Sequence, residues 1–200
     1  MFTGIIQDVG HVAEIRREPE QAHMLFATHL DMSGWALGDS VAVDGCCLTV
    51  TRFEKGMFAA TLSAETLQLT VFGEAEEGRR VNLEPALKLG DALGGHMVSG
   101  HVDGMGEVIE VANLGEHVRM RFRLSPALAR YVVKKGSVAI NGVSLTVNEV
   151  DGCDFSVNLI PHTLAHTNLD ELAAGDKVNI ETDMLGRYVE RLLQFSTEKA

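Results

Sequence analysis

Three side chains of this 200-residue sequence can take part in addition or proton-transfer chemistry: Cys47, Ser144 and His101. A thiol or hydroxyl can hydrogen-bond a substrate, or can become a nucleophile when a base lies near it. An imidazole takes up and releases protons near neutral pH. We expect Cys47 and Ser144 to hydrogen-bond a substrate, or a nucleophile that adds to it, without needing to attack covalently. Proton transfer to or from the substrate, or activation of the nucleophile that adds to it, is the role expected of His101.

Cys47 and its hydroxyl counterpart lie at the same place in two similar segments, residues 41–50 and 138–147. Both segments read as strands, in which successive side chains point to opposite faces. Cys47 therefore shares a face with Thr49, whereas Cys46 points the other way as a small core residue. An inert buried thiol is the usual state of a lone cysteine. The polar counterpart in the second segment favours a functional Cys47.

The whole sequence repeats itself in the same order. Residues 1–4 match residues 97–100 at an offset of 96, and the two strands above match at an offset of 97. The second offset relates further pairs of identical residues: Gly78 and Gly175, Val81 and Val178, Asn82 and Asn179, Glu84 and Glu181. Such a series of matches indicates two tandem copies of one domain. His101 replaces Ile5 of the first copy, so it breaks the symmetry at the junction of the domains.

We predict a first domain at residues 1–96, a second domain at residues 97–184 and a helix at residues 185–197. Short runs rich in Val, Ile, Leu, Thr and Phe alternate with turn pairs, which is typical of an all-β fold. Roughly six strands per copy suit a small closed barrel without exposed edges. Short helical turns are expected at residues 63–70 and 161–169.

The C-terminal segment has the spacing of an amphipathic helix. Its apolar residues are Leu185, Tyr188, Val189, Leu192 and Leu193. This spacing places them on one face. Either the helix covers its own barrel, or it packs against the same helix of another subunit and serves oligomerisation.

Composition limits the partners and the compartment. The formal net charge of −11 disfavours nucleic acid and anionic membranes as partners. No run of apolar residues is long enough to span a membrane, and the N-terminus has no basic, apolar leader. Three cysteines, two of them adjacent, make a poor disulfide framework, so a reducing cytoplasm is expected. His96 and His101 could suggest a metal site, but no further cysteine or carboxylate lies at ligand spacing, so no metal is expected.

The sequence resembles the riboflavin synthase family in six segments: residues 1–5, 45–50, 94–103, 142–147, 160–164 and 187–192. Their order and spacing, from Met1 to about Leu193, make the resemblance specific. It implies two six-stranded Greek-key barrels, a C-terminal helix, a homotrimer, and active sites between barrels of neighbouring subunits. Gly186 and Arg187 stand where many relatives have Ala and Lys, and we expect this position on the helix surface.

The resemblance also implies the reaction, a transferase step of riboflavin biosynthesis. Two molecules of 6,7-dimethyl-8-ribityllumazine dismutate by transfer of a four-carbon unit, giving riboflavin and 5-amino-6-(D-ribitylamino)uracil. No cofactor is needed, because the substrate ring itself delocalises the anion formed at its 7-methyl group. A duplicated domain suits two copies of one substrate, and proximity then supplies much of the rate. Lumazine synthase is a possible partner protein.

The resemblance and the repeat together indicate the site residues. The catalytic candidates are Cys47, His101, Ser144, Phe2, Ser40 and Asp183. The substrate-binding candidates of the first repeat are Gly4, Ile5, Ile6, Cys47, Leu48, Thr49, Thr61, Leu62, Ser63, Ala64, Glu65 and Thr66. Those of the second repeat are Gly100, His101, Val102, Lys135, Ser144, Leu145, Thr146, Asn158, Leu159, Ile160, Pro161, His162 and Thr163. We expect each repeat to bind one substrate molecule with its own set.

Four of these candidates have a more specific expected role, and two of the four also have a purely structural explanation. Phe2 either stacks on a substrate ring at the subunit boundary or plugs its own barrel. Lys135 either contacts the ribityl chain or is a solvated surface lysine. Ser40 and Asp183 resemble family positions near the shared site, and Asp183 aligns with an alanine of the first repeat.

Two other functions compete with the enzyme. A non-catalytic lumazine-binding antenna or carrier protein would share the duplicated fold, but the presence of both Cys47 and His101 favours catalysis. A flavin-dependent reductase barrel would need a nicotinamide-binding domain, and the sequence has no glycine-rich strand–turn–helix fingerprint.

Overall fold

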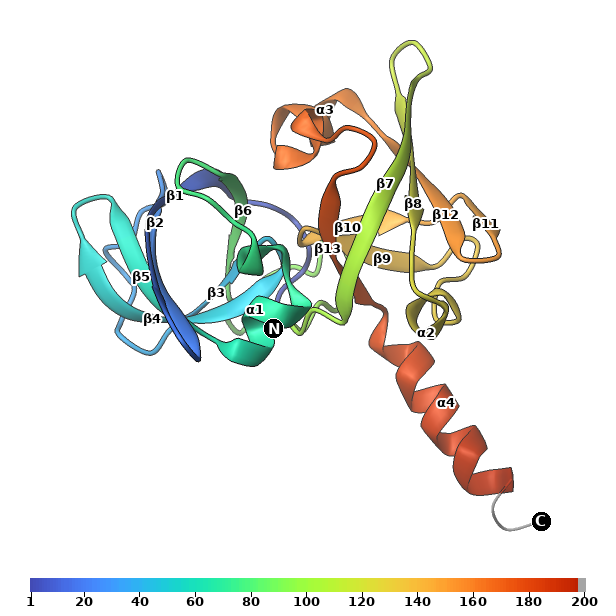
Figure 1. Cartoon of the computed structure of the whole chain (residues 1–200), viewed down its shortest axis with the longest axis horizontal. Helices are drawn as coiled ribbons and strands as arrows, with labels where there is room; N and C mark the ends of the chain where they lie inside the picture. Colours follow the sequence, from blue (N-terminus) through green and yellow to red (C-terminus); the bar gives the residue numbers. More distant parts are fainter. Residues whose placement is uncertain (198–200) are drawn as a thin grey trace.

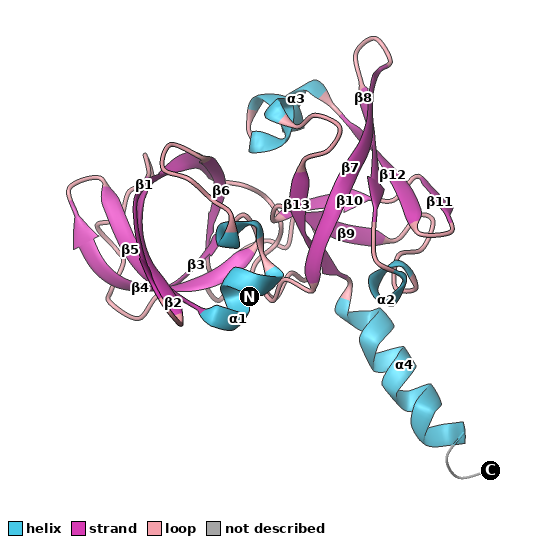
Figure 2. Ribbon diagram, in the orientation of Figure 1, coloured by secondary structure: helices cyan, strands magenta, loops and turns pink. Residues whose placement is uncertain are grey.

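The computed structural model describes residues 1–197, which form two β domains lying side by side and a C-terminal helix (Figure 1). Strands make up most of both domains, and the short helices lie at their edges (Figure 2). The expected fold class, two repeated all-β domains with a terminal helix, is confirmed. No helix within residues 1–197 is long and apolar enough to cross a membrane.

The first domain is a closed six-stranded barrel. Its strands are β1 (Asp8–Glu18), β2 (Gln21–Ala27), β3 (Ser40–Val43), β4 (Cys46–Glu54), β5 (Met57–Ser63) and β6 (Arg80–Pro85). Around the barrel they follow the order β1-β2-β5-β4-β3-β6, and β6 pairs back with β1. Strands β3, β4 and β5 are successive hairpins and β5 pairs with β2, so residues 28–39 make a Greek-key connection. Closure leaves the barrel no unpaired edge.

Alternate side chains fill this barrel. In β4, Cys46 and Leu48 are buried in the core, whereas Thr49 faces outward and is exposed. This is the period-two pattern of a half-buried strand, and it confirms the expected core position of Cys46. Aromatic rings complete the core: Phe26 and Phe58 are fully buried, with their centroids 5.3 Å apart.

The second domain repeats this topology with one break. Its strands are β7 (Gly104–Asn113), β8 (Val118–Arg123), β9 (Ser137–Ile140), β10 (Val143–Thr146), β11 (Glu149–Asp151), β12 (Asp154–Leu159) and β13 (Lys177–Thr182). They form a seven-stranded sheet in the order β10-β9-β13-β7-β8-β12-β11, in which β10 and β11 together replace β4.

The sequence predicts a second closed six-stranded barrel. The break leaves the second domain as an open sheet instead. In β4 the chain bends at a bulge between Val50 and Arg52, and the strand continues past it. At the matching corner the strand is interrupted after Thr146, and one hydrogen bond, from Asn148 N to Ser156 O at 2.8 Å, spans the gap. A bulge leaves one residue of a strand unpaired, and at this corner of the second domain residues 147 and 148 belong to no strand.

The helices lie where the strands change direction. They are α1 (Ala64–Leu69), the 3-10 turn η1 (Val71–Gly73), α2 (Pro126–Ala129), α3 (Pro161–Ala165), the 3-10 turn η2 (Asn168–Glu171) and α4 (Met184–Thr197). Ser63 caps α1, because its Oγ accepts a hydrogen bond from Thr66 N at 3.2 Å. The pairs α1–η1 and α3–η2 confirm the helical turns expected in both repeats.

Two tight turns face each other where the domains meet. Asp44 and Gly45 have φ angles of 45° and 77°, and Asn141 and Gly142 have φ angles of 45° and 80°. Two successive positive φ angles define a type I′ hairpin turn, which favours Asp or Asn followed by Gly. A Cβ on Gly45 would lie 2.7 Å from Gly142 N, and a Cβ on Gly142 would lie 2.7 Å from Gly45 N. Only glycine allows this approach.

Reciprocal hydrogen bonds join the two turns. Asn82 Nδ2 donates to Asn141 O, and Asn179 Nδ2 donates to Asp44 O, each at 2.9 Å. The backbone amides of Asp44 and Asn141 donate in turn to the carbonyls of Asn82 and Asn179, at 2.8 and 2.9 Å. We call these four residues the interdomain network. It satisfies buried polar groups of both domains in an approximately twofold-symmetric way.

One buried carboxylate makes the network asymmetric. Asp44 is fully buried, and its Oδ1 accepts hydrogen bonds from Asn82 N and from Asn168 Nδ2, both at 2.8 Å. Its Oδ2 has no hydrogen bond within the described chain and lies 3.8 Å from Arg79 Nε. Burial raises the pKa of Asp44 to about 6, although the Arg79 guanidinium opposes the shift.

Helix α4 leaves the second domain and extends away from it (Figure 1). Glu190 ties the helix to the domain, because it accepts a hydrogen bond from the Tyr131 hydroxyl and forms an ion pair with Arg130 Nη1. Arg187 forms an ion pair with Asp103. Gly186 does not lie on a free surface, as the sequence suggests, because a Cβ there would lie 3.3 Å from the Tyr131 ring.

Replacing Asp44 by Asn should raise stability at neutral and alkaline pH. The folded state favours the protonated carboxyl of Asp44, so between pH ~4 and ~6 it binds more protons than the unfolded chain. Stability therefore falls as the pH rises through this window, and the loss persists above it. Asparagine has no proton to lose and also accepts the positive φ angle. Chemical denaturation should show Asp44→Asn more stable than the wild type by up to ~3 kcal/mol at pH 8, and by much less at pH 4.

Asn141→Asp provides the matched control. It creates a buried carboxyl at the symmetric place, where Asp176 stands at the position that corresponds to Arg79. This variant should lose stability as the pH rises. Equal stability of Asp44→Asn and the wild type at pH 4 and at pH 8 would contradict the assignment.

Candidate functional site

Two short segments carry the predicted site residues across the domain junction. Residues 2–6 form the first strap, and residues 98–102 form the second strap. The straps run antiparallel and pair at Phe2 and Val98, whose backbones exchange hydrogen bonds of 2.7 and 3.1 Å. Phe2 and Val98 are almost fully buried. The straps therefore form a fixed part of the junction.

A buried glutamate of the same domain holds each strap. The carboxylate of Glu84 accepts hydrogen bonds from the backbone and side chain of Thr3 at 2.7 Å and from Gly4 N at 2.9 Å. Glu181 holds the second strap through the same three bonds, at 2.6, 2.6 and 2.9 Å. Burial raises the pKa of Glu84, and the bonds from Thr3 and Gly4 oppose that shift.

Each strap then contacts the opposite domain. Ser144 N donates to Gly4 O, and Cys47 N donates to Gly100 O, both at 2.8 Å. The glycines have φ angles of 74° and 82°, and a Cβ on either would lie 2.6 Å from the Cβ of the residue it faces. Close approach of the strap to Cys47 and Ser144 thus depends on glycine at both positions.

This crossing changes the expected composition of the two sites. Ile6 packs against the core of the second domain, and Val102 packs against the core of the first. We define the first site as residues 47–49, 61–66 and 100–102. The second site contains residues 4–6, 135, 144–146 and 158–163. The sequence predicts each strap beside the site strand of its own repeat, whereas the structure places each strap beside the site strand of the other repeat.

In the first site, Cys47 is half-buried and Thr49 is exposed on the outer face of the barrel. Ser40 lies opposite Thr49 in the β3–β4 ladder. Cys46 points into the core, where burial raises the pKa of its thiol to about 12, so it remains a neutral thiol. Thr61 lies on the neighbouring strand β5, and its Oγ1 lies 2.9 Å from His23 Nδ1.

Three predicted binding residues have buried side chains. Leu48, Leu62 and Leu159 belong to the two cores and are at most 4% exposed. A ligand on the outer face can therefore reach only their backbone groups. The polar neighbours remain accessible, since Thr61, Ser63 and Asn158 are exposed.

His101 follows the glycine that contacts Cys47. It is exposed and lines a hollow of about 440 Å³ at the base of α4. The hollow is lined by Ser99, His101, Glu181, Thr182, Met184, Arg187, Tyr188 and Arg191. Ile5, the counterpart of His101, lines a hollow of about 520 Å³ bordered by the interdomain connection. The connection and α4 thus occupy matching places in the two domains.

In the second site, Ser144 has an imidazole as a neighbour. His96 Nδ1 lies 2.7 Å from Ser144 Oγ. Asp183 is placed beside them, and its Oδ1 also accepts a hydrogen bond from Leu185 N at 3.0 Å, which caps the start of α4. Desolvation lowers the pKa of His96, and the negative charge of Asp183 opposes this shift.

Lys135 adopts a backbone conformation that its repeat partner achieves with glycine. Lys135 has a φ of 68° and Gly38 a φ of 95°, and their amides donate to the matching carbonyls of Val147 and Val50. A left-handed conformation costs a residue with a Cβ about 1–2 kcal/mol. Retaining a lysine at this cost supports a role for its side chain.

Phe2 has no free ring face. Its side chain is fully buried with Ala42, Val98 and Ala139 at the domain junction. Stacking on a substrate ring is therefore not available to Phe2 in this structure. Phe2 also does not plug its own barrel, the alternative expected from the sequence, because it is buried at the domain junction and not in the barrel core.

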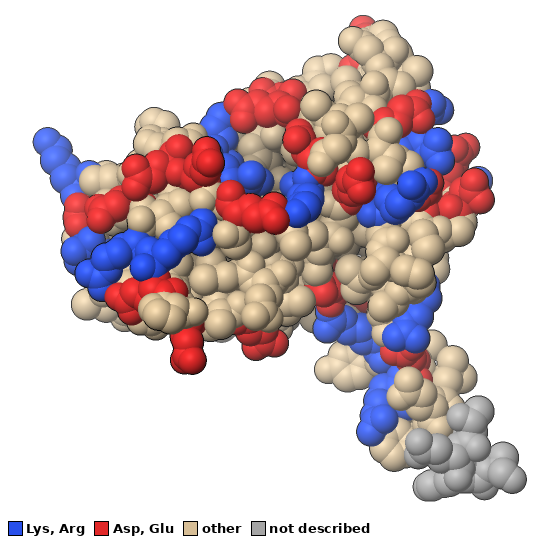
Figure 3. All heavy atoms as spheres, viewed as in Figure 1, with Lys and Arg blue, Asp and Glu red and all other residues tan. Residues whose placement is uncertain are grey.

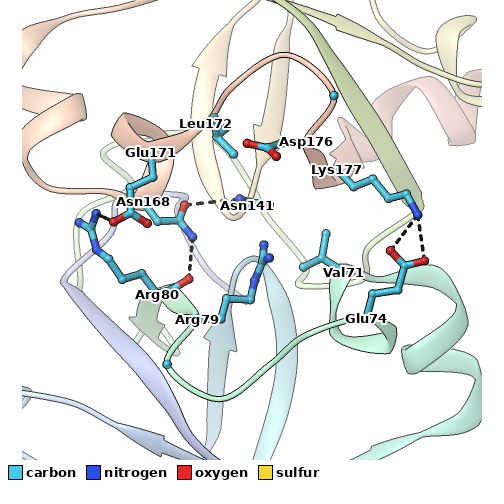
Figure 4. A pocket seen from close by; sticks show the side chains of 12 residues that line it. Val71, Glu74, Arg79, Arg80, Asn141, Asn168, Glu171, Leu172, Asp176 and Lys177 are labelled. Carbon is cyan, nitrogen blue, oxygen red and sulfur yellow. Dashed lines mark hydrogen bonds and ion pairs between the residues drawn. The ribbon is translucent and has the colours of Figure 1, made fainter.

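A cleft of about 580 Å³ lies between the domains near the interdomain network. Acidic and basic side chains gather at this junction (Figure 3). Lys177 pairs with Glu74 at 2.9 Å and Arg80 pairs with Glu171 at 2.6 Å, on opposite sides of the cleft, while Arg79 reaches into its middle (Figure 4). None of the predicted site residues lines the cleft. Its charged side chains form ion pairs that join the two domains.

Sequence reasoning missed three residues that support the sites. Glu84 and Glu181 matched in the repeat, and a carboxylate repeated before each domain end was a signal for a structural role. His96 was weighed only as a metal ligand. Within residues 1–197, no group of three or more His, Cys, Asp or Glu side chains is arranged to hold a metal ion.

Known proteins resemble the chain over nearly its full length. A sequence model of the lumazine binding domain matches residues 3–86 and 99–183. The riboflavin synthase of Actinobacillus pleuropneumoniae is 43% identical over 193 residues, which cover 96% of this chain and 90% of that protein. That of Brucella abortus (strain 2308) is 46% identical over 200 residues, which cover 98% and 99%.

A solved structure, LumP complexed with 6,7-dimethyl-8-(1'-D-ribityl) lumazine, superposes with a TM-score of 0.83 at 26% identity, covering 91% of this chain and 99% of LumP. The duplicated matches fall on the two β domains described above. The identities above 40% extend through both domains and into α4. The chain therefore belongs to the riboflavin synthase family.

Proposed function

We propose that this chain catalyses the dismutation of two 6,7-dimethyl-8-ribityllumazine molecules to riboflavin and 5-amino-6-(D-ribitylamino)uracil. The crossing of the straps is the observation that carries the proposal. It builds two related but unequal sites from one duplicated domain. One contains Cys47 and His101, and the other contains Ser144 and Ile5. A reaction between two identical molecules in different roles needs such a pair of sites.

The two sites of one chain lie at opposite ends of the paired straps. Gly4 and Gly100 each follow the Phe2–Val98 pair by two residues, in opposite directions. At ~3.3 Å per residue, four residues separate them by roughly 13 Å. Two flat rings in contact are only ~3.5 Å apart. The rings therefore meet when the first site of one subunit faces the second site of its neighbour, which supports active sites shared between subunits. The homotrimer is the assembly that the family resemblance implies.

The residues have separate roles in this scheme. His101 moves a proton to or from the acidic 7-methyl group, since it is exposed beside the first site. Cys47 and Ser144 hydrogen-bond the rings or the nucleophile that adds to one of them. Ser40 and Asp183 border the two sites. The chain's own groups supply positioning and proton transfer, while the substrate ring delocalises the negative charge.

A carrier that binds lumazine without turnover is the second candidate. The likeness to LumP complexed with the lumazine favours ligand binding and does not separate the two functions. Cys47 and His101 together favour the enzyme.

A cytoplasmic location fits the three cysteines, which are free in the structure.

Purified chain treated with EDTA should convert the lumazine to riboflavin and the pyrimidine in equal amounts. His101→Gln should bind the lumazine with little change in affinity but turn it over at least ~100-fold more slowly, because proton transfer is lost. Absorbance and chromatography measure both products. A coloured complex that forms no riboflavin would identify a carrier instead.

Replacing Lys135 by Gly should separate stability from binding. Glycine relieves the positive φ, so we expect unchanged or higher stability, by up to about 1 kcal/mol. The contact with the ribityl chain is lost, and KM should rise about fivefold, the equivalent of ~1 kcal/mol. The exposed neighbour Lys134 is the control, since Lys134→Gly should leave KM unchanged. An unchanged KM in Lys135→Gly would leave Lys135 a surface residue.

The homotrimer should depend on the exposed apolar side of α4. Leu185, Tyr188 and Val189 are 56–68% exposed, while other residues of the helix bind Arg130, Tyr131 and Asp103 of its own domain. Leu185→Glu with Val189→Glu keeps these anchors and should lower the mass seen by light scattering. An unchanged trimer would place the subunit contacts on the barrels.

Light scattering of this chain mixed with lumazine synthase would test whether the two proteins associate.

A further inference from the structure

The His96–Ser144 pair has the geometry of an activated hydroxyl. Nδ1 and Oγ are 2.7 Å apart, and the imidazole is half-buried. Its backbone is fixed by a hydrogen bond from His96 N to Thr3 O at 3.1 Å. Gly95 makes room for the pair, because a Cβ there would lie 2.1 Å from Thr3 O and 2.9 Å from Ser144 Oγ. The first strap and the end of the interdomain connection together set this contact.

The second ring nitrogen of His96 is buried and unpartnered. Within the described chain, Nε2 is inaccessible and makes no hydrogen bond. An unpartnered polar atom costs free energy, so a purely structural histidine would be poorly placed here. Desolvation lowers the pKa of the ring against the opposing charge of Asp183, which keeps it neutral at neutral pH. A neutral imidazole beside a hydroxyl can accept its proton.

The repeat supplies this imidazole to only one site. His96 Nδ1 lies beside the Ser144 hydroxyl, whereas within residues 1–197 no histidine hydrogen-bonds the Cys47 thiol. Cys47 therefore lacks the neighbour that Ser144 has. A hydroxyl is a far weaker acid than a thiol and needs an adjacent base to become nucleophilic. His96 thus lies beside Ser144, which needs an adjacent base to become nucleophilic, and not beside Cys47.

We propose that the Ser144 hydroxyl, beyond hydrogen-bonding the ring, is itself the nucleophile that adds to it. His96 is then the positioning residue that orients this hydroxyl and accepts its proton. The new bond joins Oγ to an electrophilic ring carbon, and the electron pair of the ring C=N bond moves to nitrogen. The Ser144 proton moves to Nδ1. Release of the ring breaks the C–O bond and returns the proton to Oγ, so no oxidant or reductant is consumed. This step rests on the proposed function.

The test compares His96→Asn with the wild type over a range of pH. Asparagine can still hydrogen-bond Ser144 but cannot take up a proton at these pH values. We expect kcat to fall by ~100-fold or more while KM changes little. The wild-type kcat should fall as acid protonates His96, at a pH below the usual range for histidine, and this limb should disappear in the variant. His117→Asn, at an exposed histidine in a distant turn, should behave as the wild type.

A double-mutant cycle with Ser144→Ala separates a role through Ser144 from an independent one. His96→Asn should cause little further loss when Ser144 is already alanine. Losses that multiply, or full activity of His96→Asn with an unchanged pH profile, would overturn the proposal. Thermal unfolding of every variant identifies losses caused by misfolding.

A measurement without turnover distinguishes failure of this inference from failure of the proposed function. In the wild-type chain, the His96 signal in NMR should titrate at a pH below the usual range for histidine, and Ser144→Ala should shift it. A His96 signal that titrates in the usual range for histidine and does not respond to Ser144→Ala would overturn the pair itself. A correct titration with no riboflavin formed by the wild type would overturn the proposed function alone.

Discussion

The backbone contact between two glycines fixes the arrangement of the whole molecule. Gly45 and Gly142 approach so closely that a single added carbon on either would lie 2.7 Å from the other's amide nitrogen. Both turns are type I′, so each also needs a positive φ at the preceding Asp44 or Asn141. Once the turns meet, the interdomain network satisfies their buried polar groups. The two domains then have one relative orientation, and the straps have one path.

That path makes the duplication useful. A single barrel would offer its strap no second domain to contact. Two identical unconnected barrels would make two equal sites. Here each strap is anchored by a glutamate of its own domain but contacts the site strand of the other. A substitution in one strap, such as His101 for Ile5, therefore alters the site of the opposite domain. Asymmetry in chemistry can arise without any change in fold.

Much of this fold could be predicted from local patterns. The offset between repeats predicted both domains and paired Cys47 with Ser144, and strand alternation placed Cys46 in the core. The crossing of the straps could not be predicted, because an internal match shows which residues correspond but not which domain they touch. The burial of Phe2 and the break after Thr146 depend in the same way on tertiary packing, which local sequence does not encode.

Differences between the repeats have different consequences in the apolar cores and at buried polar positions. Cores tolerate exchange of one apolar residue for another, so Cys46 and Val143 fill matching places without consequence for the barrel. Buried polar positions do not tolerate exchange singly: Asp44 opposite Asn141 is accompanied by Arg79 opposite Asp176 and by Asn168 opposite Val71. The same reasoning applies to Ser144 opposite Cys47. A hydroxyl that replaces a thiol in a reactive position needs a base beside it, and the chain supplies His96 from the segment that joins the domains.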